Sequence, residues 1–174
     1  MRQTVRKIIK RAFILIAILL FVTAFCFDNI KSNSVYYAKH TPHKEGTEPV
    51  LMMVVDNLEW IYNPEIEGIK YRFDAWCILY NYNFKLQEVP CFAGNNGGEY
   101  YYGSNGYRSY SFNKDFKLTY CRDRRVGKID IKNIDVEEVK QDIYRIVQPV
   151  IDAQSKPRVN LQWLFDIVYK DKFN

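Results

Sequence analysis

Residues that could act as nucleophiles or bases are few and scattered along this chain. Cys121 precedes three arginines whose positive charge would favour a reactive thiolate: Arg122, Arg124 and Arg125. A cysteine nucleophile also needs a nearby base such as histidine, and both histidines, His40 and His43, lie far away along the sequence. Because Cys121 ends a segment of alternating character, we interpret it as a structural cysteine.

Other motifs that could carry chemistry have simpler interpretations. Glu137 and Glu138 are adjacent, so on a helix they point apart, and a capping role fits them better than a catalytic pair. The glycine-rich segment Gly94–Gly98 opens no helix after a parallel strand, which favours a hairpin loop over a phosphate cradle. No C-x-x-C motif accompanies the histidines, so zinc is not expected. We therefore predict no enzymatic activity, no metal and no cofactor.

Tyrosine is the residue type that stands out. Five tyrosines crowd one short segment: Tyr100, Tyr101, Tyr102, Tyr107 and Tyr110. Adjacent strand residues face opposite ways, so either Tyr101 or the pair Tyr100 and Tyr102 must meet solvent or a partner. Tyrosine and arginine are common at protein interfaces. These tyrosines, with Arg122, Arg124 and Arg125, are the candidate partner-binding residues. The alternative is that the rings pair across strands and the arginines form a solvated turn.

The chain begins with a targeting segment. Five basic residues and no acid precede an apolar run from Ala12 to Phe27 that only Thr23 interrupts. Such a pattern is typical of a secretory signal or an N-terminal anchor. Lys and Arg stay on the cytoplasmic side, so residues 1–27 are predicted to hold the remainder outside the membrane.

The fate of this segment stays open between three alternatives. Its 16 apolar residues fall just short of the roughly 17 that a spanning helix needs, so an anchor requires local thinning or snorkelling. Val22-Thr23-Ala24 resembles a cleavage site, although it lies inside the apolar run. Cys26 could carry a lipid, although Phe25 stands where a small residue is needed. We favour the uncleaved anchor.

The charge balance excludes one class of partner. The whole chain has 25 basic and 20 acidic residues, and residues 1–27 hold five of the bases, which leaves 25 − 5 = 20 bases against 20 acids. A neutral domain has no excess charge to neutralise phosphates, so nucleic acid is not an expected partner. The same domain contains Cys77, Cys91 and Cys121, which allow either one disulfide and one thiol or three thiols.

The pattern beyond the anchor predicts a tether and one domain. Residues 28–48 are polar and are interpreted as a tether, and residues 49–174 as an extracytoplasmic domain. Pro49 to Tyr62 carries apolar residues at helical spacing. Residues 69–80 alternate, which predicts one strand. Further short segments separated by turns follow as strands: 84–91, 99–103, 107–112, 116–121 and 126–131, with an Asn-Gly hairpin turn at 105–106.

The C-terminal part is predicted to be helical. Asp135 should cap a helix with an apolar stripe from Val136 to Ile151, which Pro149 should kink or end. Asn160 should cap a last helix that buries Leu161, Leu164, Phe165 and Val168. The expected fold class is α+β: an antiparallel meander of five or six strands, C-terminal helices packed on one face, and a preceding N-terminal transmembrane or signal helix.

The last helix begins Asn160-Leu161-Gln162-Trp163-Leu164-Phe165. With the short anchor and the domain rich in Tyr and Phe, this segment resembles the TipC family of immunity proteins. The resemblance implies a protein held at the surface of a Gram-positive cell, which binds a secreted LXG-type toxin of type VII secretion and blocks its attack on the lipid-linked cell-wall precursor. It implies no catalysis, and it transfers no toxin-contacting residue to this chain.

Two other functions remain as alternatives. An exported module that binds cell-wall carbohydrate would stack its tyrosines on sugar rings. An exported enzyme would depend on Cys121 or on a carboxylate. The sequence specifies neither the toxin nor the oligomeric state.

Overall fold

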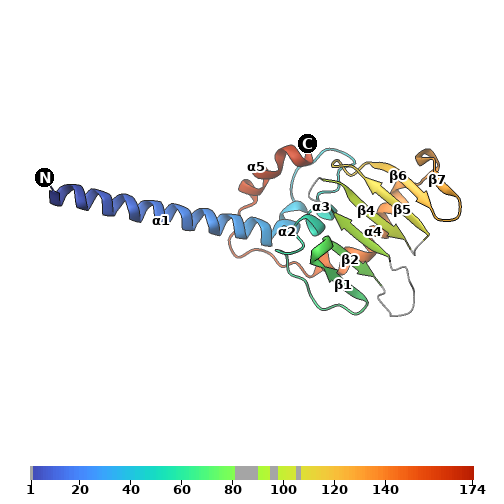
Figure 1. Ribbon diagram of the computed structural model, residues 1–174, viewed down its shortest axis with the longest axis horizontal. Helices are drawn as coiled ribbons and strands as arrows, with labels where there is room; N and C mark the ends of the chain where they lie inside the picture. Colours follow the sequence, from blue (N-terminus) through green and yellow to red (C-terminus); the bar gives the residue numbers. More distant parts are fainter. Residues whose placement is uncertain (1, 81–89, 95–97, 105–106) are drawn as a thin grey trace.

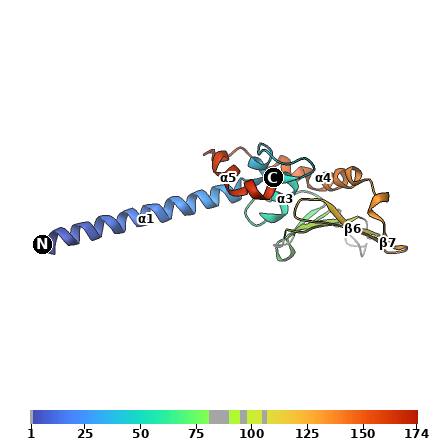
Figure 2. The same ribbon diagram turned by 90° about the horizontal axis from the view of Figure 1, so that it is seen from above.

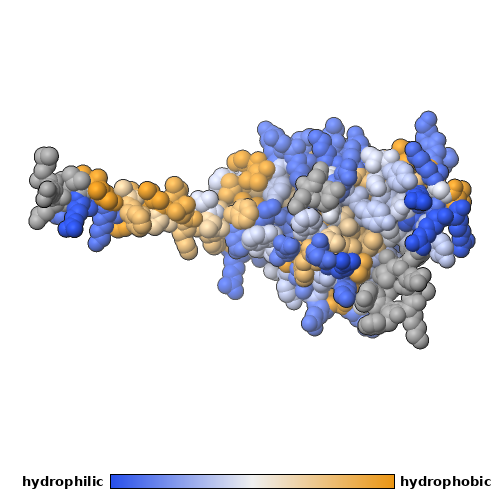
Figure 3. Space-filling model, viewed as in Figure 1, coloured by the Kyte–Doolittle hydropathy of each residue, from blue (hydrophilic) through white to orange (hydrophobic). Residues whose placement is uncertain are grey.

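An extended N-terminal helix leads into an α+β domain (Figure 1). The computed structural model describes residues 2–80, 90–94, 98–104 and 107–174. Helix α1 spans Arg2–Ser32, and its part Arg6–Ser32 is long and apolar enough to cross a membrane. This helix fits a membrane anchor or a signal sequence. Its large apolar side chains from Ile8 to Phe27 are exposed (Figure 3), as a lipid-facing helix requires.

The described part of the sheet is an antiparallel meander of seven strands, in which each strand pairs with the next along the chain. The strands are β1 Ile69–Arg72, β2 Cys77–Tyr80, β3 Cys91–Gly94, β4 Tyr100–Ser104, β5 Arg108–Phe112, β6 Leu118–Asp123 and β7 Gly127–Ile129. The α+β class and the meander are therefore confirmed. The hairpin of β4 and β5 is also confirmed, with Tyr102 opposite Tyr110, whereas most of the expected strand 84–91 lies outside the described residues.

The single strand predicted over residues 69–80 is wrong, which is why the sheet exceeds the expected five or six strands. Ile69 pairs with Tyr80 and Arg72 with Cys77, so these residues form a hairpin. A 3-10 turn, Phe73–Ala75, and the left-handed conformation of Trp76, at φ 41°, reverse the chain. The sequence shows no break here, because Phe73 and Ala75 continue the alternation of apolar residues from Tyr71 to Cys77.

Helices α3 (Pro49–Asp56) and α4 (Val136–Asp152) lie on one face of the sheet (Figure 2). Helix α3 contacts β3, and helix α4 contacts β2 and α3. Inward-pointing sheet residues fill the space between the layers: Ile78, Phe92, Tyr100, Tyr102, Tyr110 and Phe112. Glu48, just before α3, joins the helices, because it lies 2.9 Å from the Lys140 ammonium and accepts a hydrogen bond from Tyr144.

The segment predicted as a polar tether belongs to the folded domain. Residues 29–32 continue α1, and Ser34–Ala38 form helix α2, in which Val35 and Tyr37 are fully buried. The Tyr37 hydroxyl donates to the Asn29 amide oxygen at 2.7 Å and accepts from the Leu161 amide at 3.0 Å. The segment is predicted as a tether because most of its residues are polar. Its buried residues show that the domain begins at the end of α1.

Both C-terminal helices exist, with one correction. Asp135 caps α4 by accepting hydrogen bonds from the amides of Glu137 and Glu138, as expected. Pro149 is expected to kink or end the helix, and it does not end it, because α4 continues to Asp152 with Val150 and Ile151 buried. Helix α5 spans Gln162–Phe173 and packs against α2, and the Asn160 side chain accepts from the Gln162 amide at 2.9 Å. It buries Phe165, Tyr169 and Phe173 and leaves Val168 exposed, contrary to the expected stripe.

Candidate partner-binding surface

The sheet face opposite the helices is the surface that the fold leaves uncovered among the described residues. Figure 1 shows this face toward the viewer, and Figure 2 shows it on the side away from α3 and α4. We call it the outer face and define it by six side chains that the strand registers place on that side: Cys91, Tyr101, Ser109, Tyr120, Arg122 and Lys128. It is weakly polar at its centre and more hydrophilic toward the β6–β7 end (Figure 3).

Tyr101 lies at the centre of the outer face and is 42% exposed. Its ring lies over Gly103, where an added Cβ would come within 3.4 Å of the Tyr101 hydroxyl and 3.3 Å of the Cys91 sulfur. Partial burial raises the pKa of Tyr101, and a hydrogen bond with Ser109 acts in the opposite direction. The ring is thus held in one orientation by its neighbours, as an interface residue should be.

Tyr120 and two cations continue the outer face on β6 and β7. Tyr120 is 37% exposed, and the Lys128 ammonium lies 5.9 Å from its ring centroid. Arg122 lies between Ser109 and Lys128 in the sheet register and is exposed. Aromatic rings beside cations suit a partner with carboxylates and apolar side chains.

The turn between β6 and β7 extends this surface at the end of the sheet. The Arg125 guanidinium lies 4.5 Å from the ring centroid of Tyr107, which is half exposed. The Tyr107 carbonyl accepts from the Arg124 amide at 2.8 Å. The Asp123 carboxylate accepts from the Arg125 amide at 2.8 Å, and this bond, with smaller help from Arg108, lowers the pKa of Asp123. The turn is therefore fixed by its own hydrogen bonds.

Of the eight predicted partner-binding residues, the structure leaves five on the surface. Tyr101, Tyr107, Arg122, Arg124 and Arg125 are exposed and lie on the outer face or its adjoining turn.

The other three predicted tyrosines are wrong as surface residues, because they point at the helices. Tyr100, Tyr102 and Tyr110 are only 1, 4 and 6% exposed. Tyr100 donates a hydrogen bond to the Asp56 carboxylate at 3.1 Å, and the rings of Tyr102 and Tyr110 stack at 5.8 Å. They belong to the core.

Sequence reasoning missed Tyr120, Lys128 and Ser109. The signal that could have found them is the register of the Asn-Gly hairpin together with period-two alternation, which places Ser109 and Tyr101 on one face. Carrying that alternation one strand further places Tyr120 and Arg122 there too.

The three cysteines of the sheet lie on both of its faces. Cys77 and Cys91 lie on neighbouring strands on the outer side, and their thiols are hydrogen-bonded to each other, which lowers the pKa of Cys91 and raises that of Cys77. Cys121 faces the core, where burial raises the pKa of its thiol. A buried, protonated thiol is the opposite of an activated nucleophile.

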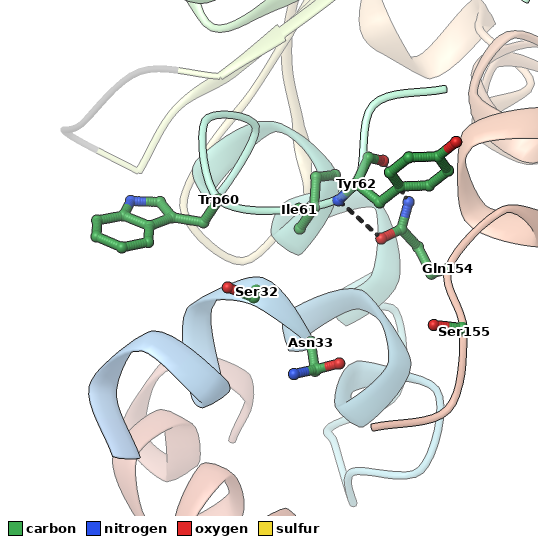
Figure 4. Close-up of a pocket in the computed structure, with 7 residues that line it drawn as sticks. All are labelled: Ser32, Asn33, Trp60, Ile61, Tyr62, Gln154 and Ser155. Atoms are coloured by element: carbon green, nitrogen blue, oxygen red, sulfur yellow. Dashed lines mark hydrogen bonds between the residues drawn. The ribbon is translucent and has the colours of Figure 1, made fainter. Parts of the chain in front are cut away.

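A pocket of about 250 Å³ lies on the helical side, where α1 enters the domain (Figure 4). Its lining contains amide, hydroxyl and aromatic groups: Ser32, Asn33, Trp60, Ile61, Tyr62, Gln154 and Ser155. The Tyr62 amide donates to the Gln154 side-chain oxygen at 3.2 Å across one wall. This lining offers no carboxylate or imidazole for acid–base chemistry. Among the described residues no group of three or more His, Cys, Asp or Glu could hold a metal ion.

No protein-family model, no curated protein and no solved structure matches this chain. The functional argument therefore depends on the fold and on its surfaces.

Proposed function

We propose that this chain is a membrane-anchored immunity protein whose domain faces the outside of a Gram-positive cell and neutralises a secreted LXG-type toxin by binding it. Helix α1 supports the anchoring, since its exposed apolar run from Ala12 to Phe27, a few ångströms short of a hydrocarbon core of roughly 30 Å, can cross a bilayer with local thinning or snorkelling. The resemblance of the last helix and of the aromatic-rich sheet to the TipC family supports the class of partner.

The observation that carries the proposal is the outer face. It presents the exposed rings of Tyr101 and Tyr120 beside Arg122 and Lys128, with no helix of the described chain over it. Interfaces concentrate binding energy in a few such aromatic and arginine side chains. The fixed conformation of Tyr101 reduces the entropy lost when a partner docks.

The test combines a cell assay with a binding assay. The proposal predicts an LXG toxin gene next to this one. Cells that export the product of that gene are compared with and without the full-length chain, and the affinity of the purified toxin for the chain in detergent micelles is measured. The variants are Tyr120→Ala and Arg122→Glu on the outer face. The control is Tyr62→Ala, a tyrosine on the helical side that is 63% exposed, against 37% for Tyr120.

Each outer-face variant should weaken toxin binding about 30-fold, which corresponds to a hot-spot loss of about 2 kcal/mol. The Tyr62→Ala chain should bind and protect as the parent does. Equal cell death with and without the parent chain would refute the toxin as the partner, and full protection by the Tyr120→Ala/Arg122→Glu chain would refute the outer face.

A wall-binding module is the second candidate, because Tyr101 and Tyr120 expose two rings on one face that could stack on sugars. Sedimentation of the chain with purified cell wall separates the two functions. An immunity protein stays in the supernatant, whereas a wall-binding module pellets, and the Tyr120→Ala variant then reduces the pelleted fraction.

A further inference from the structure

Helix α5 exposes large apolar side chains although its other face is docked in the core. Trp163, Ile167 and Val168 are 62, 65 and 58% exposed. Residues of this size gathered on one helix face indicate a contact that the isolated chain does not make. The question is what covers them.

A second exposed tryptophan lies against the end of α1. Trp60, in the segment that follows α3, is 43% exposed, and its ring packs edge-on against Phe27 of α1 at 5.5 Å. Phe27 is the last residue of the apolar run. The contact therefore holds Trp60 at the depth where the membrane-spanning part of α1 ends.

Helix α5 is tied to the same turns of α1. The Lys31 ammonium lies 5.8 Å from the ring centroids of both Phe27 and Tyr169, and Tyr169 belongs to α5. The Asn29 side chain donates to the Val159 carbonyl, just before α5, at 3.3 Å. Figures 1 and 2 show α5 beside the end of α1, and Figure 3 shows apolar side chains over α5 next to that end.

The length of the apolar run draws this region toward the bilayer. Sixteen residues from Ala12 to Phe27 span about 24 Å at 1.5 Å per residue, less than the roughly 30 Å of a hydrocarbon core. The apolar run is therefore a few ångströms too short. The mismatch is reduced when the last turns of α1 approach the acyl boundary together with the residues packed against them. Tryptophan is the side chain that prefers this depth.

We infer that Trp60, Trp163, Ile167 and Val168 form a juxtamembrane face that docks on the lipid surface of the outer leaflet. The occupant is lipid because the face adjoins the end of the exposed apolar run of α1, where Phe27 contacts Trp60 and Lys31 contacts Tyr169 of α5. The inference does not depend on the partner of the outer face, and it holds whether that partner is a toxin or a wall polymer.

The three tryptophans of the chain make a direct test. The full-length chain is reconstituted into phosphatidylcholine–phosphatidylglycerol vesicles whose acyl chains are brominated, in two single-tryptophan forms. One keeps only Trp163 (Trp60→Phe, Trp76→Phe), and the other keeps only Trp76 (Trp60→Phe, Trp163→Phe), which lies in the β1–β2 turn of the sheet. Bromine quenches only rings that approach the acyl boundary.

Trp163 emission should fall about twofold relative to unbrominated vesicles, because an interfacial face enters the bilayer by roughly 5–10 Å, and Trp76 emission should stay unchanged. Adding Ile167→Glu and Val168→Glu should abolish the quenching of Trp163. The matched control, Val126→Glu, alters a 79% exposed residue in the β6–β7 turn and should leave the quenching intact.

Three results would overturn the inference. The first is a Trp163 that is quenched no more than Trp76. The second is quenching that survives Ile167→Glu/Val168→Glu as fully as it survives Val126→Glu. The third is a reconstituted particle with two copies whose Trp163 is shielded from bromine, which would identify a second copy of the chain as the occupant.

Discussion

At Phe116 we expect the glycine variant to be more stable than the alanine variant, which is the reverse of the order in regular secondary structure. This residue ends the turn between β5 and β6 in the left-handed region, at φ 59°, and its ring is 1% exposed. The ring centroid lies 4.8 Å from that of Phe112 and 5.2 Å from that of Tyr100. The Asn113 side chain holds the turn by accepting from the amides of Asp115 and Lys117.

Two effects set the expected magnitudes. Removing the buried ring costs about 3–5 kcal/mol in either variant. Glycine is normally about 0.5–1 kcal/mol worse than alanine in regular structure, but an alanine held in the left-handed region costs roughly 1–2 kcal/mol. The second cost exceeds the first, so Phe116→Gly should be more stable than Phe116→Ala by about 0.5–1 kcal/mol.

The free energy of unfolding is measured by urea titration of the full-length chain in detergent micelles, followed by near-ultraviolet circular dichroism. Phe112 is the control, since its ring is also fully buried but its backbone, next to a register shift in β5, has no positive φ. There Phe112→Gly should be less stable than Phe112→Ala. If Phe116→Gly were likewise the weaker of its pair, the strain argument would be refuted.

Two further predictions concern the helical layer and the cysteines. Lys140→Met should destabilise the chain by about 1–3 kcal/mol in the same titration, because it leaves the half-buried Glu48 carboxylate without its cation. Burial acts to lower the pKa of Lys140, but its carboxylate partners outweigh burial and raise it. The ion pair is therefore complete below the unfolded pKa of about 10.4 and is lost as pH rises through the folded value, so the two chains should converge only at alkaline pH. Oxidised glutathione, which is reduced to two thiols in the exchange, should join Cys77 to Cys91 and leave Cys121 reduced, because Cys121 faces the opposite side of the sheet. Peptide mapping after alkylation checks this, and a disulfide containing Cys121 would contradict it.

The sequence predicted secondary structure correctly where the local pattern agreed with the tertiary packing. The pairing of β4 with β5, the Asp135 cap and the α+β class follow from local rules, and the structure confirms them. The Asn-Gly turn at 105–106 lies outside the described residues. Residues 69–80 failed because Trp76 adopts a positive φ that only glycine, asparagine or aspartate would have signalled. The helix does not end at Pro149, one of the two expected outcomes, since burial of Val150 and Ile151 outweighs one lost backbone hydrogen bond.

The candidate surface shows the same limit. Alternation correctly separates Tyr101 from Tyr100 and Tyr102. Which of the two sets faces inward depends on where α3 and α4 pack, and that information lies in residues about 40 positions away along the chain. The polar segment 28–48 failed for a related reason, because Tyr37 becomes buried only when α1 and α5 supply partners for its hydroxyl.

The direct continuation of α1 into the domain affects how a partner would meet the outer face. Phe27 against Trp60, Asn29 against Val159 and the hydroxyl of Tyr37 pin the last turns of the helix to the domain. With α1 as the proposed anchor, the domain would turn about the axis of that helix, whereas a domain on a flexible tether would tumble in three dimensions. On that proposal the outer face keeps nearly one height above the bilayer. A partner would then need to match fewer angles, so less orientational freedom is lost on binding.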